Sequence, residues 1–150
     1  MTQQTQDELR IRPATVADAD GFTDAHTDQN GSRAAALRAA VQCSPGPALI
    51  EDHAGRPVAL VGCIPMKDSN GAPWVELTGG AGAVKEALIA HLKEWTRAVL
   101  LPRHAVLFGT VPAGDELRRD ILEAVGFTFM EPIEGAGNAP ACIPCFLRAA

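Results

Sequence analysis

The sequence predicts a single mixed α/β fold (α+β class), and three observations lead to this expectation. Several short apolar segments are typical of strands, while apolar residues recur with helical spacing over residues 84–99. Clusters of Gly, Pro, Asn and Ser separate these segments, as expected of turns. The 150 residues suffice for one core, and 47% hydrophobic with 21% charged residues is ordinary for a globular domain rather than for a disordered or fibrous chain.

The expected elements follow the order strand, two helices, three strands, helix, strand, helix and two strands (β-α-α-β-β-β-α-β-α-β-β). Their approximate ranges are 9–12, 16–26, 34–41, 48–51, 57–64, 74–78, 84–99, 105–110, 115–125, 127–130 and 143–147. The three consecutive strands are expected to form an antiparallel meander, with a hairpin loop at 53–56 and a turn at 69–71. Residues 1–8 are polar and are expected to be flexible, which leaves residues 9–150 as one domain.

Local signals mark the ends of several helices. Thr15 and Asp18 resemble a capping box at the first helix, and Ser32 is a candidate cap for the second. Asp115 is expected to cap the last helix, and Gly126 is expected to end it in a left-handed conformation. These signals support the helical assignments independently of the apolar spacing.

The charge and hydropathy of the chain argue against two classes of partner. Thirteen Lys and Arg against eighteen Asp and Glu give a net charge of -5, and no basic run is interleaved with aromatic residues. Nucleic acid is therefore not an expected partner. The longest apolar runs, such as residues 57–66, are shorter than the roughly 20 residues that span a bilayer, and the N-terminus lacks the apolar core of a signal peptide. We expect no membrane contact and a protein that is cytoplasmic when synthesised.

Four cysteines occur at uneven spacings, and only Cys142 and Cys145 form a Cys-x-x-Cys pair. A four-ligand zinc site usually needs two close pairs of Cys or His, and a second pair is missing, so no metal is expected. The pair falls in the predicted last strand, where two reduced and buried thiols are the favoured interpretation. A disulfide or a redox role is the alternative.

The stretch TGGAGAVKEAL, residues 78–88, brings three glycines into the start of the long helix. Backbone N–H groups at a helix N-terminus can bind a phosphate, and glycine allows the phosphate to approach closely. A plain glycine turn explains the same residues without a ligand, and the sequence alone favours that explanation.

Two motifs carry a resemblance to a known family. IRPATVADADGF, residues 11–22, and RRDILEAVGFTF, residues 118–129, together with the order of the elements, resemble the GNAT superfamily of acyl-CoA-dependent N-acetyltransferases over residues 9–148. The resemblance implies a mostly antiparallel central sheet with helices on both faces. It also implies that acetyl-CoA would enter between residues 74–78 and 105–110, with its pyrophosphate in the loop before the long helix.

The loop departs from the family pattern, which is Arg or Gln, two residues, Gly, one residue, then Gly or Ala. One alignment places Gly80, Ala83 and Lys85 at the three positions, and another uses Gly80 and Gly82 but puts Leu77 at the basic position. The resemblance makes the following residues the candidate coenzyme ligands if acetyl-CoA binds: Leu77, Gly79, Gly80, Gly82, Ala83, Val84, Lys85 and Asp115. No alignment restores the complete motif, so the loop is predicted to be degenerate.

The resemblance also implies groups for proton transfer. Many family members protonate the leaving thiolate with a tyrosine, but the matching position is Leu122 and the chain contains no tyrosine. Cys142, Cys145 or a water could replace it. Glu76 is a candidate general base, although an outward-facing carboxylate on an alternating strand is the favoured interpretation. His91 and His104 are expected to be structural or solvated.

A closer resemblance links IRPATVADADGF, RPVALVGCIPM, PWVELTG and DILEAVGFTF to small acetyltransferase-like virion or assembly proteins of tailed bacteriophages. It implies a scaffold that contacts proteins in a virion or by self-association, with residues 65–73 and 132–144 as candidate contact segments. Loss of both the basic phosphate partner and the general acid favours this non-catalytic function. The alternative is an active acetyl-CoA-dependent N-acetyltransferase that acts on a small-molecule or protein amine.

Overall fold

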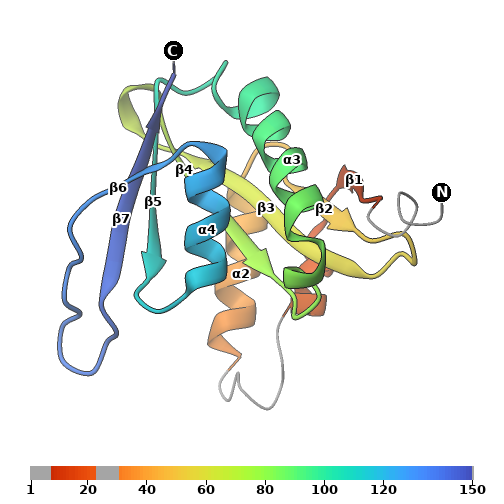
Figure 1. Cartoon of the computed structure of the whole chain (residues 1–150), viewed down its shortest axis with the longest axis horizontal. Coiled ribbons are helices and arrows are strands. Elements are labelled where there is room, and N and C mark those ends of the chain that lie inside the picture. Colours follow the sequence, from red (N-terminus) through yellow and green to blue (C-terminus); the bar gives the residue numbers. More distant parts are fainter. Residues whose placement is uncertain (1–7, 23–30, 150) are drawn as a thin grey trace. The chain divides into compact units, whose positions relative to one another are not determined.

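The observed elements follow the expected order along the chain (Figure 1). The computed structural model describes residues 8–22 and 31–149, so the expected flexibility of residues 1–7 falls outside the described residues. The elements are β1 (Arg10–Pro13), η1 (Val16–Phe22), α2 (Ser32–Cys43), β2 (Ala48–Glu51), β3 (Pro57–Pro65), η2 (Lys67–Ser69), β4 (Asn70–Leu77), η3 (Gly82–Val84), α3 (Lys85–Trp95), η4 (Thr96–Leu100), β5 (Val106–Pro112), α4 (Glu116–Val125), β6 (Thr128–Phe129) and β7 (Cys142–Arg148).

The strands pair in the order β1-β2-β3-β4-β5-β7-β6. The pairs β1–β2, β2–β3, β5–β7 and β6–β7 are antiparallel, whereas β4 and β5 pair in parallel. β3 and β4 are also antiparallel, because the Met66 amide donates to Asn70 O at 2.8 Å and the Thr78 amide donates to Val58 O at 3.0 Å. The expected mixed and mostly antiparallel sheet is confirmed.

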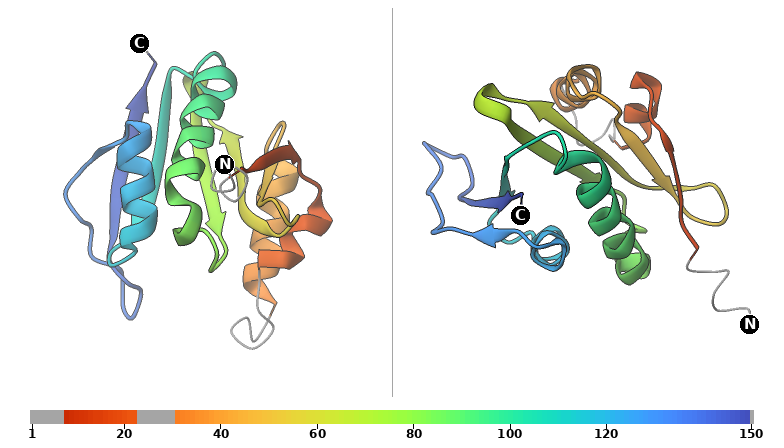
Figure 2. Two further views of the ribbon diagram at one scale, coloured as in Figure 1. Left: turned by 45° about the vertical axis from the view of Figure 1, so that its right-hand side comes forward. Right: turned by 90° about the horizontal axis from the view of Figure 1, so that it is seen from above.

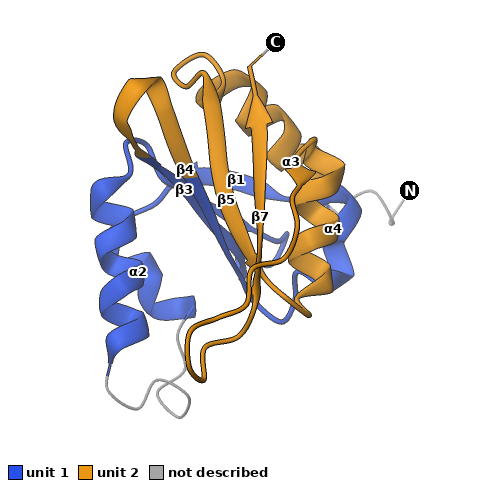
Figure 3. Cartoon of the chain, turned by 90° about the vertical axis from the view of Figure 1, so that its left-hand side faces the viewer, with its two compact units in different colours: residues 1–64, 73–87 blue, residues 65–72, 88–150 orange. Residues whose placement is uncertain are grey.

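The chain divides into two compact units, which Figure 3 colours separately. The first comprises residues 1–64 and 73–87, and the second comprises residues 65–72 and 88–150. β4 and α3 contribute residues to both units, because each element crosses a boundary. The expectation of one domain over residues 9–150 stays a prediction.

The core of the first unit is built from η1, α2, β2 and β3. η1 and α2 lie side by side (Figure 2). Five buried side chains from the four elements form one cluster, which consists of Ala19, Leu37, Val41, Leu49 and Leu60. Leu37 and Val41 are four residues apart on α2, so one face of that helix is buried. Trp74 packs against the cluster and donates from Nε1 to Ser44 Oγ at 2.8 Å.

The second unit contains β5, β6, β7 and α4. Leu107 and Val111 of β5 are fully buried, whereas Phe108 between them is 49% exposed, as the alternation of side chains along a strand requires. Ile121 of α4 is also fully buried. No helix within residues 8–22 and 31–149 is long and apolar enough to cross a membrane.

The caps of α4 match the sequence expectation. The Asp115 side chain accepts a hydrogen bond from the Arg118 amide at 3.1 Å, and Gly126 ends the helix with a φ of 125°. Both signals are local, and each satisfies backbone groups that a helix end leaves unpaired.

Of two caps expected at the other end of the chain, the Ser32 cap is wrong and the capping box of Thr15 and Asp18 forms only in part. Gly31, rather than Ser32, is the N-cap of α2, and Ser32 is already the first helical residue. At the first helix one bond of the capping box is present, because Asp18 Oδ2 accepts the Thr15 amide at 2.7 Å. The other is missing, because the Thr15 hydroxyl donates to Asp18 Oδ2 at 3.3 Å rather than accepting an amide. Asp18 also binds Arg12 from β1, so a partner distant from the helix fixes its position.

Three other boundaries differ from the expectation. The first helix is a 3₁₀-helix over Val16–Phe22, and residues 23–26 of the predicted range lie outside the described residues. The long helix is divided into η3, α3 and a π-helical turn, η4. The turn expected at 69–71 falls at Lys67–Ser69, because Asn70 already pairs with Met66 as the first residue of β4.

Candidate functional site

The loop that joins β4 to α3 is anchored at three points. The Thr78 hydroxyl donates to Pro57 O at 2.9 Å, which holds the end of β4 against β3. The Ala81 amide donates to Thr78 O at 3.1 Å, and the Val84 amide donates to Ala81 O at 3.2 Å. The Ala81 side chain is fully buried, so the middle of the loop is fixed to the first unit.

Three glycines in this loop are not required by the conformation of the chain. None of Gly79, Gly80 and Gly82 has a positive φ, the region that favours glycine. A Cβ added at Gly79 or Gly82 would meet nothing within 4 Å, and one added at Gly80 would make an ordinary contact of 3.8 Å with Thr78 Oγ1. The fold would therefore accept a side chain at each of the three positions.

Unpaired backbone amides accompany these glycines. Within the described residues the amides of Gly79, Gly80, Gly82 and Ala83 donate no hydrogen bond to the protein. All four residues are exposed. Free N–H groups before a helix N-terminus carry partial positive charge, so this part of the loop is suited to an anion.

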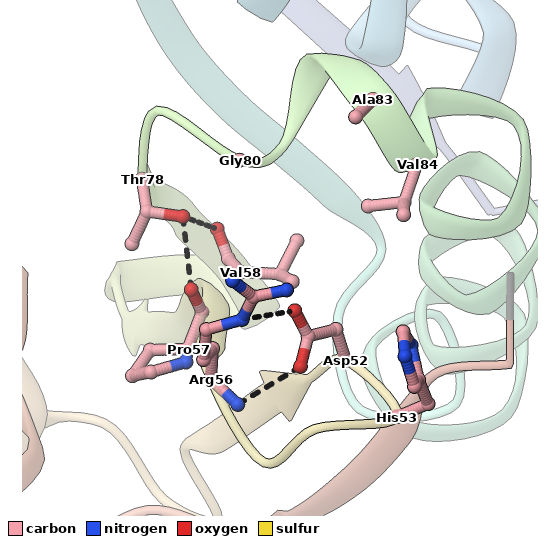
Figure 4. A pocket seen from close by; sticks show the side chains of 9 residues that line it. All are labelled: Asp52, His53, Arg56, Pro57, Val58, Thr78, Gly80, Ala83 and Val84. Atoms are coloured by element: carbon pink, nitrogen blue, oxygen red, sulfur yellow. Dashed lines mark hydrogen bonds and ion pairs between the residues drawn. The ribbon is translucent and has the colours of Figure 1, made fainter. Parts of the chain in front are cut away.

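A cavity of about 510 Å³ lies beside the loop, and all of its lining belongs to the first unit (Figure 4). Its lining residues are Asp52, His53, Arg56, Pro57, Val58, Thr78, Gly80, Ala83 and Val84. The β2–β3 hairpin reaches this loop because β3 runs antiparallel to β4, so the start of β3 lies beside the end of β4. The cavity thus combines the β2–β3 hairpin, which carries Arg56 and Asp52, with the glycine loop.

The hairpin is held by the carboxylate of Asp52. Asp52 Oδ1 accepts the amides of Ala54 and Arg56, each at 2.9 Å, and Oδ2 accepts Arg56 Nε at 3.1 Å (Figure 4). The hydrogen bond from the Arg56 amide, with that from Ala54 and the adjacent guanidinium, lowers the pKa of Asp52 from its ordinary value. Asp52 is consequently an ionised anchor for Arg56.

Glu76, the candidate general base, lies on β4 two residues before Thr78. Its Oε2 accepts Arg33 NH2 at 2.9 Å, with the Glu76 side chain 22% exposed and the Arg33 side chain 62% exposed. Glu76 does not line the cavity. The carboxylate is accessible, but it already has a cationic partner from α2.

The other predicted residues are distributed over both units. Leu77 and Lys85 are half-buried at the two ends of the loop, and Asp115 belongs to the second unit, where it caps α4. His91 is half-buried on α3, and His104 has a buried Nδ1 without a hydrogen-bond partner in the described chain. These positions supply no further group to the cavity.

The four cysteines are free thiols. Cys142 and Cys145 are three residues apart on β7, so their side chains point to opposite faces of the strand. Cys145 is 1% exposed and Cys142 is half-buried, so the expected burial is confirmed for Cys145 but not for Cys142. Burial raises the pKa of Cys145 to about 11 and that of Cys63 to about 11.

No group of three or more His, Cys, Asp or Glu in the described parts of the chain could hold a metal ion.

The sequence predicted only part of this site. Gly80, Ala83 and Val84 do line the cavity, but His53 and Arg56 were predicted only as members of a hairpin loop. The signal that could have identified them is the expected antiparallel meander. In a meander, the loop before the second strand lies next to the loop after the third strand. The charged loop of the β2–β3 hairpin therefore lies beside the loop that follows β4.

Comparisons with known proteins establish the fold but no close relative. No protein-family profile and no curated protein matches the sequence. The structure of yncA from Salmonella typhimurium, solved with its cofactor acetyl-CoA, is similar with a TM-score of 0.62 and 14% identity, covering 95% of this chain and 94% of that one. A GNAT-family acetyltransferase from Bacillus anthracis gives 0.63 and 12%, covering 94% and 95%. The ribosomal-protein-S5-alanine acetyltransferase from Vibrio fischeri gives 0.62 and 10%, covering 94% and 93%. The chain has the fold of GNAT acetyltransferases.

Proposed function

We propose that the chain binds an acyl-coenzyme A at the loop between β4 and α3 and transfers the acyl group to an amine. The observation that carries this proposal is the open space around three glycines of the loop. Gly79, Gly80 and Gly82 have neither a positive φ nor a close neighbour that would exclude a side chain. Close approach of a ligand phosphate to the backbone is a reason to keep glycine at such positions.

The unpaired amides support the same assignment. The loop lacks the basic residue of the family pattern, but the amides of Gly79, Gly80, Gly82 and Ala83 offer donors to a diphosphate. The fold adds support, because yncA holds acetyl-CoA in its structure and the two folds are similar over most of both chains. Acetyl-CoA is therefore the coenzyme that we expect.

The proposed reaction is an acyl transfer. The nitrogen of a neutral amine attacks the thioester carbonyl, a C–N bond forms and the C–S bond breaks, so that the products are an amide and coenzyme A. The attacking nitrogen must lose one proton, and the leaving thiolate must gain one.

Glu76 is the proposed base for the amine proton. It lies on the strand that leads into the loop, and its partner Arg33 is 62% exposed, so Arg33 can move into solvent when an amine binds. The proton for the thiolate is assigned to water, because the chain has no tyrosine and Cys145 is 1% exposed. Without a side-chain acid we expect turnover about 100-fold below that of an enzyme with one.

Calorimetric titration with coenzyme A tests the proposal through two matched variants. Gly80 lines the cavity and Gly21 of η1 does not, yet both accept a Cβ without a clash. We expect micromolar binding by the wild-type chain, an affinity at least tenfold weaker for Gly80→Ala, and little change for Gly21→Ala. No heat with the wild-type chain at millimolar coenzyme A would contradict the proposal.

A second candidate function has its own supporting observation in the second unit. Phe108, Met130 and Ile133 are 49%, 54% and 56% exposed, and Phe108 is paired across β5 and β7 with Phe146. Large apolar side chains grouped at a surface are typical of protein contacts. Ile133 also lies in the 132–144 segment that the sequence singles out. This surface supports a virion-associated or assembly protein that contacts a second copy of the chain and lacks efficient catalysis.

Analytical ultracentrifugation separates the second candidate from the first. If the apolar surface joins two copies, the wild-type chain is a dimer at micromolar concentration and Phe108→Gln is a monomer with unchanged coenzyme affinity. A wild-type chain that stays monomeric at about 100 µM, and that releases coenzyme A from acetyl-CoA in the presence of an amine, would overturn the second candidate.

A further inference from the structure

We infer that Arg56 supplies the cation that the β4–α3 loop lacks, and that its guanidinium binds a phosphate of the coenzyme in the cavity of Figure 4. The inference rests on the proposed function, because it names the residue that would bind the phosphates at the same site. It assigns this task to the β2–β3 hairpin rather than to the loop itself.

The lining of the cavity places Arg56 beside the glycine loop. Arg56 and His53 come from the hairpin, and Gly80, Ala83 and Val84 come from the loop. Both segments lie in the first unit, and the Thr78 hydroxyl joins them by donating to Pro57 O at 2.9 Å. A phosphate in this cavity would therefore face backbone amides on one wall and a guanidinium on another.

The hairpin holds the start of the Arg56 side chain in place. Gly55 has a φ of 79°, which permits the tight turn, and the Asp52 amide donates to Arg56 O at 2.9 Å. Asp52 Oδ2 then accepts Arg56 Nε at 3.1 Å. Asp52 is thus a positioning residue for Arg56.

The rest of the guanidinium remains available to a ligand. Among the described residues, Nε is the only guanidinium nitrogen of Arg56 with a protein partner, and the Arg56 side chain is 74% exposed. The two terminal nitrogens form an edge that matches two oxygens of a phosphate. Asp52 also lines the cavity, and its negative charge is partly offset by the three hydrogen bonds that it accepts from the hairpin.

The test compares Arg56 with an arginine in a similar ion pair elsewhere. Arg97 binds Glu94 at 2.7 Å and its side chain is 71% exposed, but it belongs to the second unit and does not line the cavity. We expect coenzyme A to bind Arg56→Ala roughly 10- to 100-fold more weakly than the wild-type chain, and to bind Arg97→Ala unchanged. Arg56→Lys should recover only part of the loss, because a lysine cannot form the bidentate contact.

Two further binding experiments identify which phosphate Arg56 binds and whether Asp52 acts through Arg56. Dephospho-coenzyme A lacks the 3′-phosphate. If Arg56 binds the diphosphate, Arg56→Ala should weaken the binding of dephospho-coenzyme A as much as that of coenzyme A. If Arg56 binds the 3′-phosphate, wild-type and Arg56→Ala chains should bind dephospho-coenzyme A equally. Asp52→Asn should weaken coenzyme A binding in the wild-type background and have no effect in the Arg56→Ala background. Additive effects of the two substitutions would show that Asp52 acts on coenzyme A binding independently of Arg56, and would overturn its role as a positioning residue.

The outcomes distinguish this inference from the proposed function. Equal coenzyme A affinities of the wild-type chain, Arg56→Ala and Arg97→Ala would overturn the assignment of Arg56 and leave the proposed function in place. Absence of coenzyme A binding by the wild-type chain would overturn both. If Arg56→Ala and Arg97→Ala weaken coenzyme A binding equally, the loss of affinity is explained by the change in net charge. That result would also overturn the assignment of Arg56.

Discussion

The indole ring of Trp74 lies directly over Gly62, with no room for a side chain between the two strands. A Cβ added at Gly62 would lie 2.6 Å from Trp74 Cε2 and 2.8 Å from Trp74 Nε1. The indole cannot move freely, because Nε1 donates to Ser44 Oγ at 2.8 Å and Ser44 Oγ donates to Ala40 O at 2.7 Å. Gly62 is therefore required by packing, unlike the glycines of the β4–α3 loop.

This contrast predicts opposite effects of two alanine substitutions on stability. We expect Gly62→Ala to reduce the free energy of unfolding by about 1–3 kcal/mol, because the added methyl group displaces a ring that is hydrogen-bonded. Gly82→Ala adds its methyl group to open space and should change stability by less than about 0.5 kcal/mol. Urea unfolding followed by tryptophan fluorescence measures both. Equal losses of unfolding free energy for Gly62→Ala and Gly82→Ala would contradict the distinction between a glycine required by packing and a glycine in open space.

The ion pair between β1 and η1 predicts a specific response to acid. The hydrogen bond from Arg12 lowers the pKa of Asp18, and the Thr15 amide adds to the effect. Because the pKa of Asp18 is lower in the folded than in the unfolded chain, the pair stabilises the fold at neutral pH, and this contribution is lost as the pH falls through the folded value.

The response is checked with Asp18→Asn. The wild-type chain should be more stable than the variant at pH 6, and the difference should shrink below about pH 4. Urea unfolding midpoints at pH 6 and pH 3 provide the comparison. A stability difference that is the same at both pH values would show that the charge of Asp18 is not what matters.

The cysteines are predicted to react at very different rates. Burial raises the pKa of both Cys63 and Cys145 to about 11, so roughly one thiol in a thousand is ionised at pH 8. Cys43 is exposed. We expect iodoacetamide to alkylate Cys43 within minutes, and Cys63 and Cys145 only after unfolding in urea, as followed by peptide mass spectrometry. Rapid labelling of Cys145 in the folded chain would contradict its placement on β7.

The proposed base is tested by comparing the two partners of its ion pair. Glu76→Gln removes the proton acceptor and should lower the rate of coenzyme A release from acetyl-CoA and an amine by about 100-fold or more, with unchanged coenzyme affinity. Arg33→Ala removes the cationic partner that α2 supplies to Glu76 and should keep the activity. If Glu76→Gln is as active as the wild-type chain, Glu76 serves only as the partner of Arg33.

The order of elements follows from the sequence because its signals are local. Asp115 and Gly126 cap α4 through bonds to residues within one helical turn, and a short window of sequence contains both partners. Asp18 makes the expected bond to the Thr15 amide, but it also binds Arg12 of β1, a contact between two elements that the local pattern does not contain. Local patterns thus specify most elements but not the contacts between them.

The candidate site depends more on pairing than on local pattern. The glycine loop is visible in the sequence, but Arg56 reaches it only through the antiparallel pairing of β3 with β4. The openness around Gly79 and Gly82 is likewise a property of the folded chain, since the same letters could form a packed turn. For this reason the sequence alone favours a plain turn, and our proposal of a ligand site depends on the contacts of the folded chain.

The most direct test of coenzyme binding at the β4–α3 loop is a ¹H–¹⁵N chemical-shift titration of the wild-type chain with coenzyme A. The unpaired amides of Gly79, Gly80, Gly82 and Ala83 should show the largest shifts, because they would donate to the diphosphate. Unchanged amide shifts in residues 78–85 at millimolar coenzyme A, or shifts confined to another part of the chain, would contradict the account.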